Sequence, residues 1–267
     1  MMTHRRTRTR SLIAAAVGAL VLPAQAFADG EIGEHVQTYW KHMDEYAAGV
    51  DRMNSALDDL VAEAEAGAFD EADVDRLVEV WEDVKVHGAI EVVATPLYPP
   101  IWEGIYALRD AAAETASADA VASAAEQTSV ALHEGLGALR LATYQHEIGE
   151  GPDLAGRGAP ADDPIHAIED RLSQAVAKYQ EGHADDAKAL IHDAYFNYFE
   201  GIEGALIEQD AALVTTLEED FNGALPNLIN RGASVEDIRG QVNAMMEKLH
   251  RAEDLLAKAE NDKGDVF

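Results

Sequence analysis

Apolar residues recur three and four positions apart along most of this 267-residue chain. Residues at that spacing share one face of an α-helix, and another apolar surface has to cover that face. The clearest run starts near Val36 and continues through Tyr39, Met43, Tyr46, Val50, Met53, Leu57, Leu60 and Ala64. No segment shows the alternation of apolar and polar residues that is typical of a half-buried strand. The sequence therefore predicts an all-α protein.

Glycine and proline divide the helical pattern into two groups of four helices. Residues 151–164 are rich in both and predict a linker. The linker separates an N-terminal helical bundle over residues 29–150 from a C-terminal bundle over residues 165–267, so the predicted fold is two four-helix units. The helices of the C-terminal bundle are expected at 165–181, 184–208, 211–231 and 234–260.

Several helix ends carry recognisable signals. Gly67 follows the first helix, and Asp70 is placed to cap the second. Ser234 with Asp237 forms a capping-box arrangement before the last helix. Pro226 is expected to kink the helix before it, because proline lacks the backbone N–H of a regular turn.

The first 28 residues have the three parts of a secretion signal. Arginines at positions 5, 6, 8 and 10 are followed by the apolar run Leu12 to Leu22, which is too short to span a bilayer. Ala26-Phe27-Ala28 is a small-x-small cleavage site, so the mature chain is expected to start near Asp29 in the periplasm. The sequence leaves the export route open between general secretion and the twin-arginine route. No later stretch approaches about 18 uninterrupted apolar residues, so the mature chain is not expected to span a membrane.

Composition excludes several kinds of chemistry. The chain has no cysteine, which excludes disulfides, iron–sulfur clusters and covalently attached haem. Its formal net charge is −30, and it becomes −34 when the four signal arginines are removed. Such a charge argues against nucleic acid as a partner and permits attraction of cations, although a salt-adapted surface has the same composition. No nucleophile set, phosphate loop or dinucleotide motif is present, so the sequence does not predict an enzyme.

His87 and Glu91 form the best local candidate for a metal site. They continue the apolar stripe of Val80 and Val84, which places both on the inward face of the second predicted helix. Side chains four residues apart on a helix are close enough to share one ion. A polar pair on an inward face needs partners, which are either each other or a metal. A hydrogen-bonded His–Glu pair at the helix end is the alternative.

Glu200 and Glu203 form the second candidate pair. They lie three residues apart on a helix beside Phe196 and Phe199, and hard cations are bound by such oxygen ligands. Glu200 also belongs to a recurring motif, a ring-bearing residue followed by Glu-Gly and an aliphatic residue. The motif occurs at Trp102-Glu103-Gly104-Ile105, His133-Glu134-Gly135-Leu136 and Phe199-Glu200-Gly201-Ile202.

Glycine inside a helix usually permits a close backbone approach. Convergence of Glu103, Glu134 and Glu200 on one site is one hypothesis for the motif, and the alternative is that Glu103 only complements the N-terminal dipole of its helix after Pro100. His133 belongs to the same motif and is a further candidate ligand. His42 with Glu45, which border the first helix seam, and His146, which ends the fourth stripe, complete the set of candidate metal ligands.

A longer pattern runs from Leu172 to Leu256. Its elements are Tyr179-Gln180-Glu181-Gly182-His183, Asp193-Ala194-Tyr195, Phe199-Glu200-Gly201-Ile202-Glu203, Asp210-Ala211-Ala212-Leu213-Val214, Leu217-Glu218 and Leu249 to Leu256 with Ala252-Glu253 inside it. This segment resembles the extracytoplasmic helical domain of bacterial high-affinity iron permeases. The resemblance covers about a third of the chain and implies iron, as Fe²⁺ or Fe³⁺, bound by Glu200 and Glu203.

Two departures limit what the resemblance implies. The membrane helices of the permease are missing, so the chain is not expected to be the channel itself. The CxxCH segment of some family members is also missing, which fits the expected absence of haem. The sequence therefore predicts a periplasmic protein that binds iron or another divalent cation and supplies or regulates an iron permease or other inner-membrane protein.

Two alternatives remain at the level of sequence. A metal-free helical module that docks on a membrane partner would present an exposed apolar groove rather than an internal polar pocket. A ferritin-like oxidase would need paired Glu-x-x-His motifs, and no clean pair occurs.

Overall fold

The computed structural model describes residues 34–152, 154 and 163–264, and every regular element in these ranges is a helix. The all-α prediction is confirmed for this part of the chain. The first half contains α1 (Glu34–Gln37), η1 (Tyr39–Lys41), α2 (Met43–Ala66), α3 (Glu71–Asp83), α4 (Val86–Val93), η2 (Thr95–Leu97), α5 (Tyr98–Ala113) and α6 (Ala118–Glu147). The second half contains α7 (Pro164–Gln180), α8 (Ala184–Ala194), η3 (Tyr195–Phe199), α9 (Glu200–Glu219), η4 (Asp220–Ala224), α10 (Leu225–Asn230) and α11 (Val235–Gly264).

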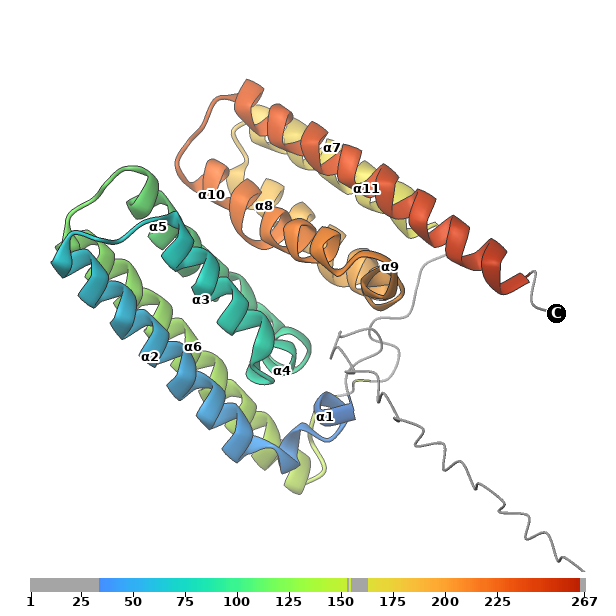
Figure 1. Cartoon of the computed structure of the whole chain (residues 1–267). Helices are drawn as coiled ribbons and strands as arrows, with labels where there is room; N and C mark the ends of the chain where they lie inside the picture. Colours follow the sequence, from blue (N-terminus) through green and yellow to red (C-terminus); the bar gives the residue numbers. More distant parts are fainter. Residues whose placement is uncertain (1–33, 153, 155–162, 265–267) are drawn as a thin grey trace, which may run out of the picture.

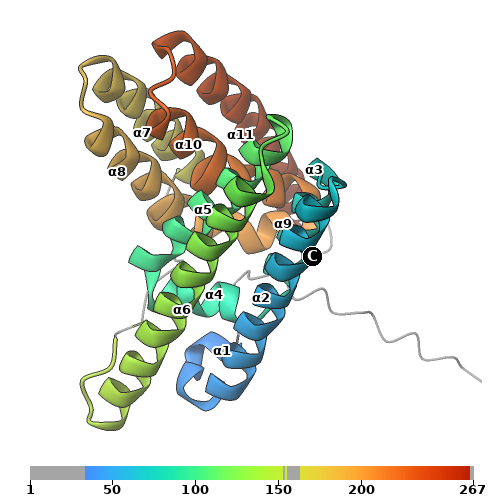
Figure 2. The same cartoon turned by 90° about the vertical axis from the view of Figure 1, so that its left-hand side faces the viewer.

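The long helices of the first half pack side by side. Helix α6 packs against both α2 and α5, and α3 packs against the other sides of α2 and α5 (Figure 1). The short helix α4 lies across the end of this group, where it contacts α2 and α6. Figure 2 shows α2 and α6 running along one face of the molecule with α4 near them.

In the second half, α7 packs against α8 and α11, and α11 also packs against α9 (Figure 1). The halves meet where α5 contacts η4 and α10. Buried apolar residues from Tyr39 to Ala252 form one continuous cluster across this contact. Both halves therefore share one core, and the grouping into two four-helix units stays a prediction.

Local sequence signals explain several helix ends. Gly67 ends α2 with a φ of 70°, a left-handed conformation that glycine adopts without strain. Asp70 caps α3 in a capping box with Asp73. Before α11, the Ser234 Oγ accepts a hydrogen bond from the Asp237 N–H at 3.1 Å, and Asp237 Oδ2 accepts one from the Ser234 N–H at 3.2 Å. The predicted caps at these three positions are confirmed.

The first two predicted helices are each interrupted, which corrects the sequence analysis. The helix expected from Val36 onward is divided into α1, η1 and α2. The second ends at Asp83, because Val84 is extended with a φ of −93° and a ψ of 128°. A Cβ placed on Gly49 would lie 3.3 Å from Val84 Cβ and 3.1 Å from Val86 Cγ1. The break thus lets α4 turn onto α2 at Gly49, where an added Cβ would be tightly packed against Val84 and Val86.

The long helical path of the second half also contains irregular turns. Asp210 breaks α9 with a φ of −159° and a ψ of 83°, and its Oδ1 accepts a hydrogen bond from the Leu213 N–H at 3.1 Å. This break lies between the helices expected at 184–208 and 211–231. Two π-helices, η3 and η4, flank α9, and η4 comes directly before Leu225-Pro226, where a kink was expected.

The predicted signal peptide and most of the predicted linker lie outside the described residues. Within the described ranges, no helix combines the length and apolar character needed to cross a bilayer.

Candidate metal centre

Side chains with oxygen or nitrogen ligands meet inside the helical core. They come from five elements: Glu82 from α3, His87 and Glu91 from α4, Tyr98 from α5, Tyr195 from η3, and Glu203 and Glu218 from α9. All except the half-buried Glu82 are buried. Potential ligand atoms of Glu91, Glu203 and Glu218 lie within 4.8 Å of one another, and the same holds for Glu82, His87 and Glu218. We name these seven side chains the carboxylate centre.

The break in α9 is what brings Glu203 and Glu218 together. Fifteen residues of straight helix would separate them by about 22 Å along the axis. Because Asp210 ends the first part of α9, the second part folds back and returns Glu218 to the level of Glu203. The π-helix η3 begins at Tyr195, which belongs to the centre, and the π-helix η4 begins at Asp220, two residues after Glu218. Such segments are rare and often occur at functional sites.

Tyr195 links the carboxylates of the two halves. Its Oη lies 2.5 Å from Glu91 Oε1 and 3.1 Å from Glu218 Oε1. A phenol has one proton, so only one of these hydrogen bonds can be donated by Tyr195. The other requires a proton on a carboxyl group. The geometry therefore fits a centre that holds at least one shared proton when no cation is bound.

Burial favours the protonated form of Glu218. Its pKa is raised well above the usual value by burial first, and then by the negative charges of Glu82, Glu203 and Glu91. The hydrogen bond from Tyr195 opposes this shift. The charged groups with the largest effect on this pKa are all carboxylates. Protonation of a carboxyl group reduces the repulsion between these buried negative charges, and a bound cation would reduce it as well.

His87 is held as a neutral imidazole. Its pKa is lowered to about 3 by burial. His87 Nε2 is 2.7 Å from the Tyr98 hydroxyl oxygen, and Nδ1 is 3.5 Å from Glu82 Oε2. The ring also stacks on Tyr98, with centroids 5.4 Å apart and an interplanar angle of 10°. Neutral imidazole is the form that binds metals, so His87 is prepared for coordination at neutral pH.

The structure brings three predicted residues into the centre. His87 and Glu91 are each 4 % exposed, and their expected inward orientation is confirmed. Glu203 is also 4 % exposed. Glu200, its predicted partner, is half-buried and belongs to neither group of potential ligands.

The predicted convergence of the Glu-Gly motifs is wrong. Glu103 and Glu134 are exposed, and Glu103 Oε1 accepts a hydrogen bond from Asn230 Nδ2 at 3.1 Å. The glycine of the motif instead permits close packing between helices. A Cβ on Gly104 would lie 2.3 Å from Thr128 Oγ1, and a Cβ on Gly135 would lie 2.5 Å from Ile90 Cδ1. Each glycine faces the core, so the glutamate before it points to solvent.

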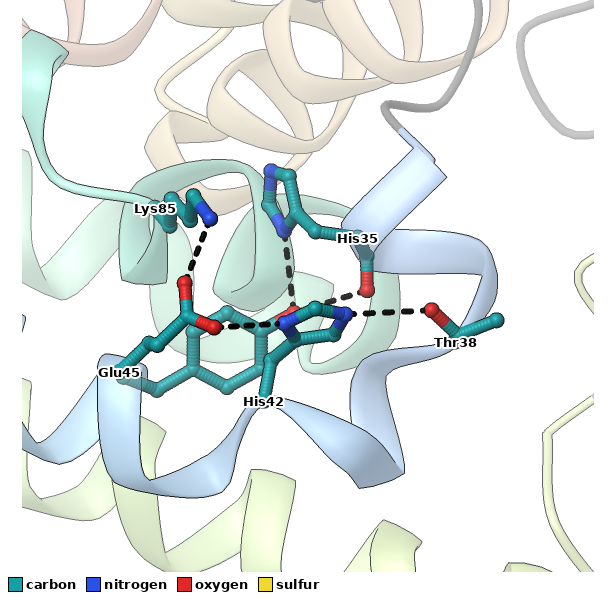
Figure 3. A network of polar contacts seen from close by, with 6 residues as sticks. His35, Thr38, His42, Glu45 and Lys85 are labelled. Atoms are coloured by element: carbon teal, nitrogen blue, oxygen red, sulfur yellow. Dashed lines mark hydrogen bonds and ion pairs between the residues drawn. The ribbon is translucent and has the colours of Figure 1, made fainter.

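His42 and Glu45 belong to a separate polar network near α1 (Figure 3). His42 Nδ1 is 3.0 Å from Glu45 Oε1, and Lys85 Nζ donates to Glu45 Oε2 at 2.5 Å. These contacts with Lys85 and His42 lower the pKa of Glu45 to about 2. Thr38 Oγ1 lies 3.2 Å from His42 Nε2. Because the carboxylate is already paired with an ammonium group, this network does not resemble an open metal site.

The two remaining candidates lie on α6. The exposed His133 donates from Nδ1 to the Ser129 carbonyl oxygen at 2.8 Å. The half-buried His146 stacks on Trp40, with ring centroids 3.5 Å apart. Neither belongs to a group of potential metal ligands among the described residues.

Sequence reasoning missed Glu82, Tyr98, Tyr195 and Glu218. A signal existed for Glu218, because it continues the buried stripe of Val214, Phe221 and Leu225 at helical spacing. A carboxylate on such a stripe needs a partner, by the argument used for Glu91. The tyrosines gave no signal beyond that of ordinary core aromatics. Glu82 was missed because the stripe was extended through Val84 without a break.

We compared the chain with known proteins by three routes. No family model matches it, and neither a curated protein nor a solved structure matches it. The resemblance to iron-permease domains therefore stays a prediction, and the residues of the carboxylate centre carry the functional argument.

Proposed function

We propose that this protein binds iron or another hard divalent cation in the carboxylate centre. The observation that carries the proposal is that Glu91, Glu203 and Glu218 are buried and have potential ligand atoms within 4.8 Å of one another. Ionised carboxylates in a dry core need a counter-charge. A cation supplies that charge, and its binding would compete with protonation of Glu218, whose pKa is raised by burial.

The ligand chemistry favours hard cations. Carboxylate oxygens with one imidazole suit Fe, Mn or Zn better than soft ions such as Cu(I), which prefer thiolate or thioether ligands. The chain offers no cysteine. Among the candidates, iron is also the ion that the resemblance to permease domains implies. We therefore place iron first and treat the others as competitors in the test.

The biological role that fits this centre is that of a periplasmic accessory protein. It would supply an ion to an inner-membrane iron permease or regulate that permease. This part of the proposal is supported by the signal-like N-terminus and by the resemblance of residues 172–256. The proposed periplasmic role is independent of the chemistry of the centre. It is therefore tested separately, by measuring export of the protein and its binding to membranes that contain the permease.

Calorimetric titration of the metal-free mature chain tests the proposal. Fe²⁺ without oxygen, Fe³⁺ in a weak chelate, Mn²⁺ and Cu²⁺ are compared at physiological salt. We expect Glu203→Gln to weaken Fe²⁺ binding at least tenfold, while Glu134→Gln on the exposed face of α6 binds as the unmodified chain does. Binding no tighter than about 1 mM by any ion would refute the metal function.

One observation favours the alternative of an interaction module. Large apolar residues along α6 and at its C-terminal end are more than half exposed: Val130, Leu141, Tyr144 and Ile148, which directly follows the helix. They recur at helical spacing along one face. Gly137 lies on the same face, and no atom lies within 4 Å of a Cβ placed on it. Exposed apolar stripes often mark binding surfaces. If no metal binds, a protein-docking function through this face of α6 is the reading that remains.

A further inference from the structure

Glu218 belongs to two groups of potential ligands at once. One group is Glu82, His87 and Glu218, and the other is Glu91, Glu203 and Glu218. Within each group the ligand atoms lie within 4.8 Å of one another. An ion at the centre of such a triangle lies at most about 2.8 Å from each atom, so movements of at most about 0.6–0.8 Å bring all three atoms to ligand distances of about 2.0–2.2 Å. The centre thus offers two ion positions that share one carboxylate.

The charges of the centre also match two ions. Its carboxylates are Glu82, Glu91, Glu203 and Glu218, which carry four negative charges when ionised. Two divalent cations together carry four positive charges, which equals the charge of the four carboxylates when all are ionised. Burial of uncompensated charge is strongly unfavourable. The charge of the centre is therefore sufficient for occupancy of both positions.

His87 and Glu91 are arranged to serve different ions. They lie one helical turn apart on α4, so their side chains leave the helix about 6 Å from each other. His87 belongs to the group with Glu82, and Glu91 belongs to the group with Glu203. Two-metal sites place their ions about 3.5–4 Å apart, a separation that one turn of helix accommodates.

The surrounding tyrosines fix the ligands of each ion. Tyr98 contacts His87 Nε2 at 2.7 Å, and Nδ1 faces Glu82 at 3.5 Å. This leaves Nδ1 as the ligand atom and lets Nε2–H donate to the phenol, as ligating histidines commonly do. Tyr195 lies within hydrogen-bonding distance of Glu91 and Glu218, which belong to the second group. Both tyrosines are positioning residues in this arrangement.

We infer that the carboxylate centre holds a pair of hard divalent cations bridged by the Glu218 carboxylate, with Glu82 and His87 binding one ion and Glu91 and Glu203 binding the other. This inference rests on the proposed function, which requires only that some cation binds. The two are separated by counting ions. A single-ion centre would satisfy the proposed function and refute the pair.

The test uses the mature chain, stripped of metal and equilibrated with Mn²⁺ by dialysis. Bound Mn²⁺ is counted by elemental analysis, and electron paramagnetic resonance reports whether the ions are magnetically coupled. We expect two Mn²⁺ per chain with a coupled spectrum. One Mn²⁺ with an isolated-ion spectrum overturns the pair, and no Mn²⁺ together with no Fe²⁺ overturns the proposed function as well. Two uncoupled ions would place the second one outside the centre and would also overturn the pair.

Variants assign the ligands. His87→Ala is expected to keep one uncoupled Mn²⁺ per chain, and Glu218→Gln is expected to abolish the coupled signal. The exposed Glu134→Gln serves as the matched control and should keep two coupled ions. A coupled pair that persists in Glu218→Gln would refute the bridge. Circular dichroism of each variant checks folding, and if a variant does not fold, the count and coupling in the unmodified chain still decide the inference.

Discussion

The hydroxyl group of Tyr195 lies 2.5 Å from Glu91 Oε1, a contact between residues 104 positions apart in the chain. It connects the π-helix η3 of the second half with α4 of the first half. Both residues are buried, and the same hydroxyl group lies 3.1 Å from Glu218. The contact therefore couples the packing of the two halves to the state of the carboxylate centre.

Tyr195→Phe should destabilise the metal-free protein. The substitution removes the hydroxyl partner of Glu91 and Glu218 and leaves the ring packing in place, so we expect the free energy of unfolding to fall by about 1–3 kcal/mol. Urea denaturation followed by circular dichroism measures this change. Tyr144→Phe is the control, because Tyr144 is 58 % exposed and should be nearly neutral. Equal effects of the two substitutions would show that the Tyr195 hydrogen bonds contribute nothing.

Glu91→Gln separates a structural role from a ligand role. If Glu91 only accepts a hydrogen bond, the loss of about 1–3 kcal/mol should be the same with and without metal. If Glu91 binds an ion, the variant should lose much of the added stability, which is about 2.7 kcal/mol when free ion exceeds the dissociation constant a hundredfold. Thermal melts of both proteins with and without Fe²⁺ measure the difference. An unchanged metal-induced shift in the variant would exclude Glu91 as a ligand.

The network around His35 predicts a loss of stability in mild acid. Burial, followed by the positive charges of Lys85 and His42, lowers the pKa of His35 from 6.5 to about 4, and Glu45 opposes this shift. Between these two values the unfolded chain binds a proton that the folded chain does not, so stability falls as the pH decreases from about 6.5 to about 4. Because His35 is only half-buried, we expect its contribution to be about 1–2 kcal/mol.

The measurement is urea denaturation at a series of pH values. His35→Gln should flatten the pH dependence in this window, whereas His133→Gln on the exposed face of α6 should leave it unchanged. Tyr46, which donates to the His35 carbonyl oxygen at 3.0 Å, keeps that bond in the variant. If the slope is the same in the variant and the unmodified chain, other groups determine the acid response.

Much of the fold follows from local sequence because helices are local structures. Apolar spacing located the helices, and Gly67, Asp70 and Ser234 marked ends that the structure confirms. The break at Val84 was not predictable in this way, since valine is not a helix breaker. Its cause is tertiary: α4 turns there to pack on Gly49, which is distant in sequence.

The centre was predictable only where a polar residue stands on an apolar stripe. That rule found His87 and Glu91, and it would have found Glu218 beside Val214 and Phe221. The rule does not say which stripes meet, because the meeting of α4 with α9 depends on the break at Asp210 and on the packing of both halves. Glu103 and Glu134 show the opposite error, in which a repeated motif reflected packing of glycine rather than a site.

Two glycines of α6, two residues apart, test how much space the contact between α4 and α6 leaves for an added methyl group. A Cβ on Gly135 would lie 2.5 Å from Ile90 Cδ1 and 3.0 Å from Ile90 Cγ1, so Gly135→Ala should destabilise the protein by about 1–3 kcal/mol through overpacking. Nothing lies within 4 Å of a Cβ on Gly137, so Gly137→Ala should stabilise the helix by up to about 1 kcal/mol.

Because Ile90 precedes Glu91 on α4, Gly135→Ala should also displace a ligand and weaken metal binding, while Gly137→Ala should not. Urea denaturation and Mn²⁺ titration of both variants measure these effects. If Gly135→Ala is destabilised and yet binds Mn²⁺ as tightly as Gly137→Ala, then Ile90 absorbs the added methyl group by changing its rotamer, and the position of α4 is not set by its contact with α6.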